Sequence, residues 1–302
     1  MFSALENNPY FGQLARILSN RKTVKFSLVA AAGAFIGSII GYQFGGGAVS
    51  GFVFGVLKVS AWDACIGIGI GASIAWIQSQ YMRTLNTRNK QVLQTSLRCA
   101  LGGAVGGAAL VVIKSVVDGS VGHIMAWTVE GTIIGWLLAP VFPNLPKKPA
   151  IFSGMLAGFF GALIGPLIAS ILGENIGIAA ADSLKGLFLG AMLTFAEKYQ
   201  AVKDGSLLIH WGKNETSTIL LGKKSVFIGS APECQVFVKK DELTHPSVIA
   251  EICLTNGMIF LKNKKDGRVS ELLDRTIINV GTVKLEVKTG ITAVQQEKKS
   301  SI

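Results

Sequence analysis

Three acidic side chains and one lysine lie within long apolar segments of this sequence. Glu130 stands in AWTVEGTIIGW, Asp63 in AWDACIGIG and Asp182 in AADSLKG, and Lys185 follows three residues after Asp182. A charged side chain in the apolar interior of a membrane is costly and commonly serves a solute path or a proton relay. These four residues therefore form the candidate intramembrane polar site. In the alternative interpretation they lie within about one turn of the outer interface, where a carboxylate stays hydrated.

Lys185 has two possible roles in such a segment. Its ammonium could pair with Asp182 at the i,i+3 spacing of a helix. It could instead extend along the helix to the water interface, as long basic side chains often do. We expect the outward orientation.

The segments around these residues have the composition of a membrane protein. The chain of 302 residues is 50% hydrophobic and 16% charged, with a mean hydropathy of +0.48, whereas soluble domains are about 25% charged. Six apolar runs approach the roughly 20 residues that a membrane helix needs. They predict a polytopic α-helical domain over 26–198, after a cytoplasmic N-terminal segment over 1–25. The six predicted spans are 26–45, 60–79, 97–114, 124–142, 151–172 and 178–196.

Every predicted span contains glycines four residues apart. In water each internal glycine costs about 1 kcal/mol against alanine, but in a bilayer the helix is kept because its backbone groups have no other partners. GxxxG then allows close approach of two helices. The spacing predicts glycine-zipper contacts between helices, through Gly33, Gly37, Gly41, Gly67, Gly71, Gly102, Gly106, Gly131, Gly135, Gly154, Gly158, Gly186 and Gly190.

The glycine pattern also indicates an internal repeat. Alignment of the second, fourth and sixth spans on their first GxxxG glycine places Asp63, Trp127 and Asp182 at one position. The pattern predicts a helical hairpin that occurs three times, with diverged connections. Internal repeats are common in transporters, and they also occur in passive membrane scaffolds.

The net charge of +11 is concentrated in alternate loops. Basic residues dominate the N-terminal segment and the loops after the second and fourth spans, whereas the other loops carry few of them. By the positive-inside rule both termini are expected in the cytoplasm. The short loops and the cytoplasmic C-terminal region favour a bacterial inner membrane as the location. The basic excess is then a topology signal that contacts anionic lipid headgroups, and we expect no binding to nucleic acid.

After about residue 205 the pattern changes to short β-rich runs between polar turns. Runs such as SLLIHW, SVFIG, SVIAEICL and TVKLEV predict an all-β sandwich over 206–288. Asn256-Gly257 is the signature of a type I′ hairpin turn. The polar segment 289–302 is expected to be a disordered tail.

Three stretches of this region resemble the forkhead-associated (FHA) domain, a β-sandwich family that commonly reads phosphothreonine peptides. They are KKSVFIGSAPECQVFV, HPSVIAEI and the closing TIINVGTVKLEV. The resemblance implies a cytoplasmic module that docks a protein partner.

The phosphate-binding residues of that family are replaced in this sequence. Ser230 stands where the family has an arginine, Pro246 where it has a loop serine and Ile249 where it has a structural histidine. Because phosphate recognition depends on charge-assisted donors, we expect no phosphothreonine binding. A substitute anion site or partner-binding loop, with an ordinary solvated loop as the alternative, could use Ser230, Lys239, Lys240, Thr244, His245 and Ser247.

The sequence contains no pattern typical of an enzyme. Phosphate loops, catalytic triads and clusters of metal ligands are missing from it, so we expect no catalytic residues, no metal and no cofactor. The preferred hypothesis is an integral membrane scaffold that docks a cytoplasmic protein, within a membrane complex or a homo-oligomer. Two alternatives are a channel or transporter formed by the repeated hairpins and a protein that handles lipids or remodels membranes.

Overall fold

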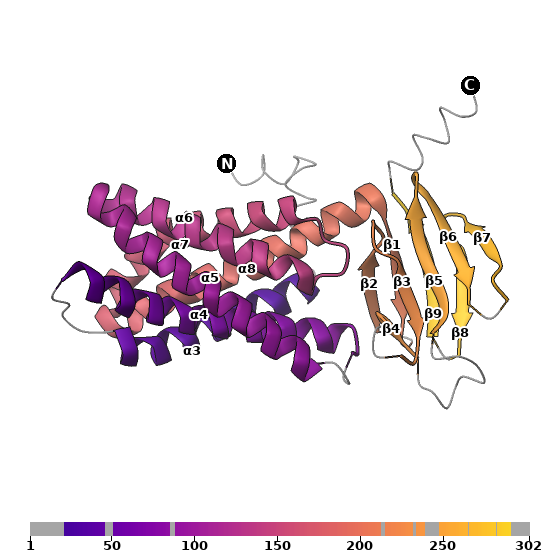
Figure 1. Ribbon diagram of the computed structural model, residues 1–302, viewed down its shortest axis with the longest axis horizontal. Helices are drawn as coiled ribbons and strands as arrows, with labels where there is room; N and C mark the ends of the chain where they lie inside the picture. Colours follow the sequence, from indigo (N-terminus) through magenta and orange to yellow (C-terminus); the bar gives the residue numbers. More distant parts are fainter. Residues whose placement is uncertain are drawn as a thin grey trace, which may run out of the picture. The chain divides into compact units, whose positions relative to one another are not determined.

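A computed structural model shows six long helices followed by two small β-sheets (Figure 1). It describes residues 21–45, 51–84, 88–212, 215–231, 234–238, 248–264, 266–281 and 283–290. The chain forms two compact units, a helical unit and a β unit. The β unit contains residues 78–89 and 142–145 in addition to the chain from Glu197 onward.

All six helices are long and apolar enough to cross a membrane, as the sequence predicts. The chain is therefore an integral membrane protein with a six-helix domain. The helices are α3 (Arg21–Gly45), α4 (Phe52–Tyr81), α5 (Arg88–Val116), α6 (Gly119–Leu138), α7 (Lys147–Leu172) and α8 (Glu174–Asp204), with a short 3₁₀ helix η1 (Ala139–Val141) after α6.

Two of the connections between helices are very short. Gly173 alone separates α7 from α8, and its φ of 83° lies in the left-handed region that a side chain disfavours. Val117 and Asp118 alone separate α5 from α6, and Gly119 opens α6 at a φ of 73°. Short connections of this kind make α5–α6 and α7–α8 antiparallel neighbours, which agrees with the predicted hairpins.

The same glycine contact recurs three times between helices. A Cβ added at Gly67 of α4 would lie 2.1 Å from the Cys99 carbonyl oxygen of α5. At Gly131 of α6 it would lie 2.3 Å from the Gly154 carbonyl oxygen of α7. At Gly186 of α8 the corresponding distance is 2.5 Å, to the carbonyl oxygen of Ala30 in α3. Because these are backbone atoms, any side chain at the three glycines would force the helices apart.

These contacts close the six helices into a ring. Each even-numbered helix touches the next odd-numbered one, and α8 returns to α3. Within each hairpin a second glycine makes an equivalent approach: Gly37 against Ile66, Gly106 against Glu130 and Gly161 against Lys185. The threefold hairpin repeat expected from the glycine spacing is thus visible in corresponding contacts.

All thirteen glycines named in the sequence analysis face a neighbouring helix. A Cβ added at any of them would come within 3.0 Å of an atom of that helix. The glycine faces are thereby occupied within the ring.

The β unit contains two sheets of mostly antiparallel strands (Figure 1). One sheet has the order β2-β1-β9-β8, with strands β1 (Gly205–His210), β2 (Thr216–Leu220), β8 (Ile277–Val280) and β9 (Val283–Thr289). The other has the order β4-β3-β5-β6-β7, with β3 (Val226–Gly229), β4 (Val236–Phe237), β5 (Val248–Thr255), β6 (Met258–Asn263) and β7 (Val269–Leu272).

A single hydrophobic core joins the two sheets. Leu207, Leu285 and Val287 contribute from one sheet, and Ile228 and Ile252 from the other. The β-sandwich-like architecture is therefore as predicted. The Asn256-Gly257 turn also has the expected geometry, with φ of 51° and 79° at the two residues. Strand β7 was not predicted, because three of its four side chains are exposed and its sequence lacks an apolar run.

Two polar connections complete the β unit. The Ser217 hydroxyl donates to the Tyr81 carbonyl oxygen at 2.6 Å and accepts a hydrogen bond from Trp211 Nε1 at 2.9 Å. The Asn144 side-chain amide donates to the carbonyl oxygens of Leu220 and Lys224, and its Oδ1 accepts from the Lys224 N–H. These bonds satisfy backbone groups at the end of α4, at the end of β2 and in the loop before β3.

Candidate functional site

The hairpin repeat places two side chains, one turn apart, on each even-numbered helix. The first position is occupied by Asp63, Trp127 and Asp182, and the second by Ile66, Glu130 and Lys185. All six side chains are buried, and the exposed fraction of the four ionisable residues ranges from 0% at Glu130 to 7% at Asp63. The repeat therefore brings the four candidate polar residues to one level of the ring.

Lys185 occupies the centre of this cluster. Its Nζ donates a hydrogen bond to Glu130 Oε2 at 2.6 Å and lies 3.8 Å from Asp182 Oδ1. The ammonium also lies 4.5 Å from the centre of the Trp127 ring, where a cation is attracted to the face of an aromatic ring. One cation thus contacts groups from two helices and two positions of the repeat.

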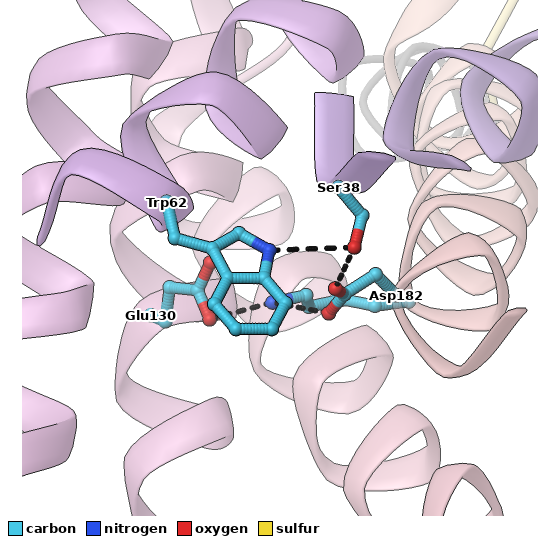
Figure 2. A network of polar contacts seen from close by, with 5 residues as sticks. Ser38, Trp62, Glu130 and Asp182 are labelled. Atoms are coloured by element: carbon cyan, nitrogen blue, oxygen red, sulfur yellow. Dashed lines mark hydrogen bonds and ion pairs between the residues drawn. The ribbon is translucent and has the colours of Figure 1, made fainter. Parts of the chain in front are cut away.

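Asp182 is held by a second chain of hydrogen bonds, shown in Figure 2. The Ser38 hydroxyl donates to Asp182 Oδ2 at 2.7 Å, and Trp62 Nε1 donates to the Ser38 oxygen at 3.3 Å. Ser38 lies on α3 and Trp62 on α4, so this chain crosses the interface at which the ring closes. Both Asp182 oxygens therefore have polar groups nearby.

Asp63 and Glu130 each retain a buried oxygen without a hydrogen-bond partner among the described residues. These atoms are Asp63 Oδ2 and Glu130 Oε1. Both carboxyl groups pack on a pair of glycines in α5: a Cβ at Gly107 would lie 2.9 Å from Asp63 Oδ2, and one at Gly106 would lie 2.2 Å from Glu130 Cγ. An unsatisfied buried oxygen is costly, so each of these two atoms calls for an explanation.

The formal charges of the cluster do not balance. Three carboxylates and one ammonium sum to −2 when all four groups are ionised. An ionised carboxylate in a medium of low dielectric is so unfavourable that it normally takes up a proton or a cation. The described residues contain no group of three or more His, Cys, Asp and Glu side chains suited to a metal ion. A positive charge that reached this cluster, such as a proton, would offset part of the negative charge.

One expectation from the sequence is wrong in this part of the chain, and the alternative interpretation of the three carboxyl groups is not borne out. Lys185 does not extend outward, because it is 1% exposed and bonded to Glu130. Asp63, Glu130 and Asp182 are buried among helices instead of lying hydrated at the end of a span. Burial of these charged groups costs desolvation energy, and the pairing of Lys185 with the carboxyl groups offsets this cost. The pairing depends on contacts between helices that are distant in the sequence.

Sequence reasoning overlooked Ser38 and Trp62. Ser38 corresponds to Gly107 and Ala162 once the odd-numbered helices are aligned on the carbonyl groups that receive the GxxxG glycines. Ser38 is the polar residue at these three corresponding positions, and this difference between the repeats could have indicated its role. Trp62 had no such signal, because tryptophan is common near membrane interfaces.

The predicted partner-binding loops of the β unit lie mostly outside the described residues. Ser230 is described and half-buried, directly after strand β3. The remaining candidates, Lys239, Lys240, Thr244, His245 and Ser247, lie outside the described part of the chain. The buried cluster of the helical unit is therefore the candidate site that can be described in atomic detail. Comparison with family models, curated proteins and solved structures gives no match to this chain.

Proposed function

We propose that the six-helix ring carries protons or a monovalent cation across the membrane, as a channel or transporter. The observation that supports this function best is the buried cluster with three carboxyl groups, one ammonium and two carboxylate oxygens that have no hydrogen-bond partner among the described residues. Ionisable residues placed inside a membrane domain are typical of ion paths and proton relays. The internal hairpin repeat is also common among transporters.

A purely structural role for the cluster explains these observations less well. Replacement of a buried ion pair by apolar residues is often neutral or stabilising, so a pair is a weak source of stability. The repeat itself offers the apolar solution, because Ile66 occupies the position of Glu130 and Lys185. A ring built for packing alone would need no charge at the other two positions.

Flux measurements with the purified full-length protein test this proposal. The protein is reconstituted in liposomes of phosphatidylcholine and phosphatidylglycerol, and movement of H⁺, Na⁺ and K⁺ down an imposed gradient is followed separately. Wild-type protein is expected to increase the flux of one of these ions, and Glu130→Gln to reduce it at least tenfold. Asp118→Asn, at an exposed aspartate before α6, is the matched control. Wild-type flux equal to that of empty liposomes would refute the proposal.

We propose a bacterial inner membrane as the location, with the N-terminus and the β unit in the cytoplasm. The distribution of Lys and Arg among the loops supports this orientation, and the same side chains are proposed to contact anionic headgroups. Protease accessibility in inverted membrane vesicles tests the orientation. We also propose that the chain forms a homo-oligomer, and light scattering of the protein in detergent measures its oligomeric state.

The β unit supports a second function, the docking of a cytoplasmic protein by a FHA-like module without phosphate-binding residues. Strands β7 and β8 each end a sheet, and three exposed apolar side chains lie on or beside them: Val269 (61%), Leu273 (63%) and Ile277 (51%). An open edge strand with apolar side chains can accept an extended segment of a partner.

Partner capture from detergent extracts tests this second function. The full chain is compared with a version that ends after Gln200 and with Val269→Lys, which places a charge on the open edge. A partner retained by the full chain and lost in both variants supports docking through the sandwich, whereas equal capture by all three contradicts it. Lipid handling is not proposed, because the GxxxG faces are turned toward neighbouring helices.

A further inference from the structure

We propose that Asp63 is the carboxyl group of the cluster that binds and releases the transported ion, and that this ion is a proton. The inference rests on the function proposed above, because it assigns that function to one residue and one ion. It follows from a comparison of Asp63 with Asp182, which occupy the same position in two copies of the hairpin.

The two aspartates have different partners. Asp182 Oδ2 accepts a hydrogen bond from the Ser38 hydroxyl at 2.7 Å, and its Oδ1 lies 3.8 Å from Lys185 Nζ. The residue that corresponds to Ser38 beside Asp63 is Gly107, which offers no hydroxyl. Asp63 Oδ2 is buried without a hydrogen-bond partner in the described structure. The surroundings of Asp182 thus suit a carboxylate, and those of Asp63 suit a neutral acid.

Close packing explains why a hydroxyl does not replace the missing partner. A Cβ at Gly107 would lie 2.7 Å from the Val59 carbonyl oxygen and 2.9 Å from Asp63 Oδ2. Both distances are shorter than ordinary contacts of a Cβ atom, and one neighbour is backbone. The α4–α5 interface therefore excludes a side chain at this position and leaves no room for a hydroxyl beside Asp63 Oδ2.

A proton on Asp63 fits this arrangement. The protonated carboxyl is neutral, so it brings no charge into the buried interface, and its O–H gives the group a donor that the carboxylate lacks. A carboxylate here would instead carry a buried charge whose Oδ2 has no hydrogen-bond donor among the described residues. Protonation joins H⁺ from water to the carboxylate oxygen, and release returns the H⁺ to water, so no other reactant is needed.

The charges around Asp63 favour it as the group that takes up and releases the proton. The charged groups that act on it are Glu130 of α6 and Asp182 and Lys185 of α8, while α5 presents Gly103 and Gly107 to it. Lys185 is already bonded to Glu130 and lies near Asp182, so its single charge is shared by two carboxylates. One proton on Asp63 brings the formal charge of the cluster from −2 to −1.

A proton fits this site better than a metal ion. Coordination of a divalent or alkali cation needs several oxygen ligands converging on one point, and the described residues contain no cluster of potential ligand side chains of that kind. A proton needs only one carboxyl group, which Asp63 provides.

Infrared difference spectroscopy tests the assignment without any measurement of flux. Full-length protein in lipid is titrated from neutral to alkaline pH, and the carbonyl stretch of protonated carboxyl groups is recorded in H₂O and D₂O. Wild-type protein is expected to show a band at neutral pH that shifts in D₂O and disappears as the pH is raised. Asp63→Asn is expected to remove this band, whereas Asp118→Asn, in the exposed residue before α6, should leave it intact.

Two results would overturn the assignment. One is a wild-type protein without a protonated carboxyl band at neutral pH, and the other is a band that persists in Asp63→Asn. Circular dichroism of each variant establishes that it is folded, and Asp63→Glu, which retains the acid, should restore a shifted band. Failure of the flux experiment with a normal Asp63 band would refute transport alone, and flux without the band would refute the role of Asp63 alone.

Discussion

Replacement of Lys185 by methionine tests whether the ammonium holds the buried cluster together. Lys185 Nζ lies 2.6 Å from Glu130 Oε2 and 3.8 Å from Asp182 Oδ1, and the side chain is 1% exposed. Methionine is similar in length and apolar, so the change removes the charge with little loss of packing. Glu130 and Asp182 would then be two buried carboxylates without their cation.

The expected cost is large. At an effective dielectric constant of 20, two unit charges about 4 Å apart interact by roughly 4 kcal/mol. Removal of one partner from a buried ion pair typically costs about 3–5 kcal/mol, because the other charge is left unpaired. We therefore expect Lys185→Met to lower the free energy of unfolding by about 3–5 kcal/mol. Lys148→Met, at an exposed lysine in the first turn of α7, should change it by less than about 0.5 kcal/mol.

The assay is unfolding of the full-length protein in detergent micelles by SDS, followed by circular dichroism. A double variant, Lys185→Met with Glu130→Gln, should lose less than the sum of the single losses, with an interaction energy of about 1–3 kcal/mol. A loss for Lys185→Met no greater than that of Lys148→Met would refute the reasoning. Additive losses in the double variant would show that the two residues do not interact.

Three further predictions concern other parts of the chain. Gly154→Ala should destabilise the helical unit by about 1–3 kcal/mol through overpacking, because its Cβ would lie 2.0 Å from a backbone oxygen of α6. Unfolding by SDS measures this loss. Gly212→Ala, with open space around the added Cβ, should be tolerated in that assay. Asn144→Ala should lower the melting temperature of the β unit. The free energy of unfolding should fall by about 2–3 kcal/mol, because the three hydrogen bonds to the backbone of Leu220 and Lys224 are lost. The pKa of Glu251 is held below its ordinary value by a hydrogen bond from Lys264 at 2.5 Å. This bond therefore stabilises the fold above the unfolded-state pKa of about 4.3, and the stabilisation is lost as the pH falls through the lower pKa of the folded state. Melting of wild type and Glu251→Gln across that range should converge at the acidic end, and parallel curves would contradict the last prediction.

The general architecture could be predicted because its signals are local. Length and hydropathy gave the six spans, and β-rich runs between turns indicated the sandwich. The glycine spacing predicted which helix faces pack and, through the alignment of Asp63 with Asp182, the threefold repeat. Strand β7 escaped prediction because exposed side chains at the edge of a sheet leave no periodic pattern.

The geometry of the cluster could not be predicted because it depends on how the ring closes. Lys185 was expected to reach water, a reasonable choice for an isolated helix. Its actual partner, Glu130, is 55 residues away in the chain, and the Ser38–Asp182 bond joins residues 144 apart. The first bond joins α8 with α6 and the second joins α8 with α3, and neither composition nor spacing specifies these contacts between distant helices.

Proton movement into liposomes is the measurement that most directly tests the role of the buried cluster. Full-length wild type, Asp63→Asn and Asp118→Asn are reconstituted at equal density, and an enclosed pH-sensitive dye reports acidification after an imposed pH step. Wild type and Asp118→Asn are expected to acidify the interior at the same rate, and Asp63→Asn at least tenfold more slowly. Equal rates in wild type and Asp63→Asn, or no acidification by wild type beyond that of empty liposomes, would contradict a proton path through this cluster.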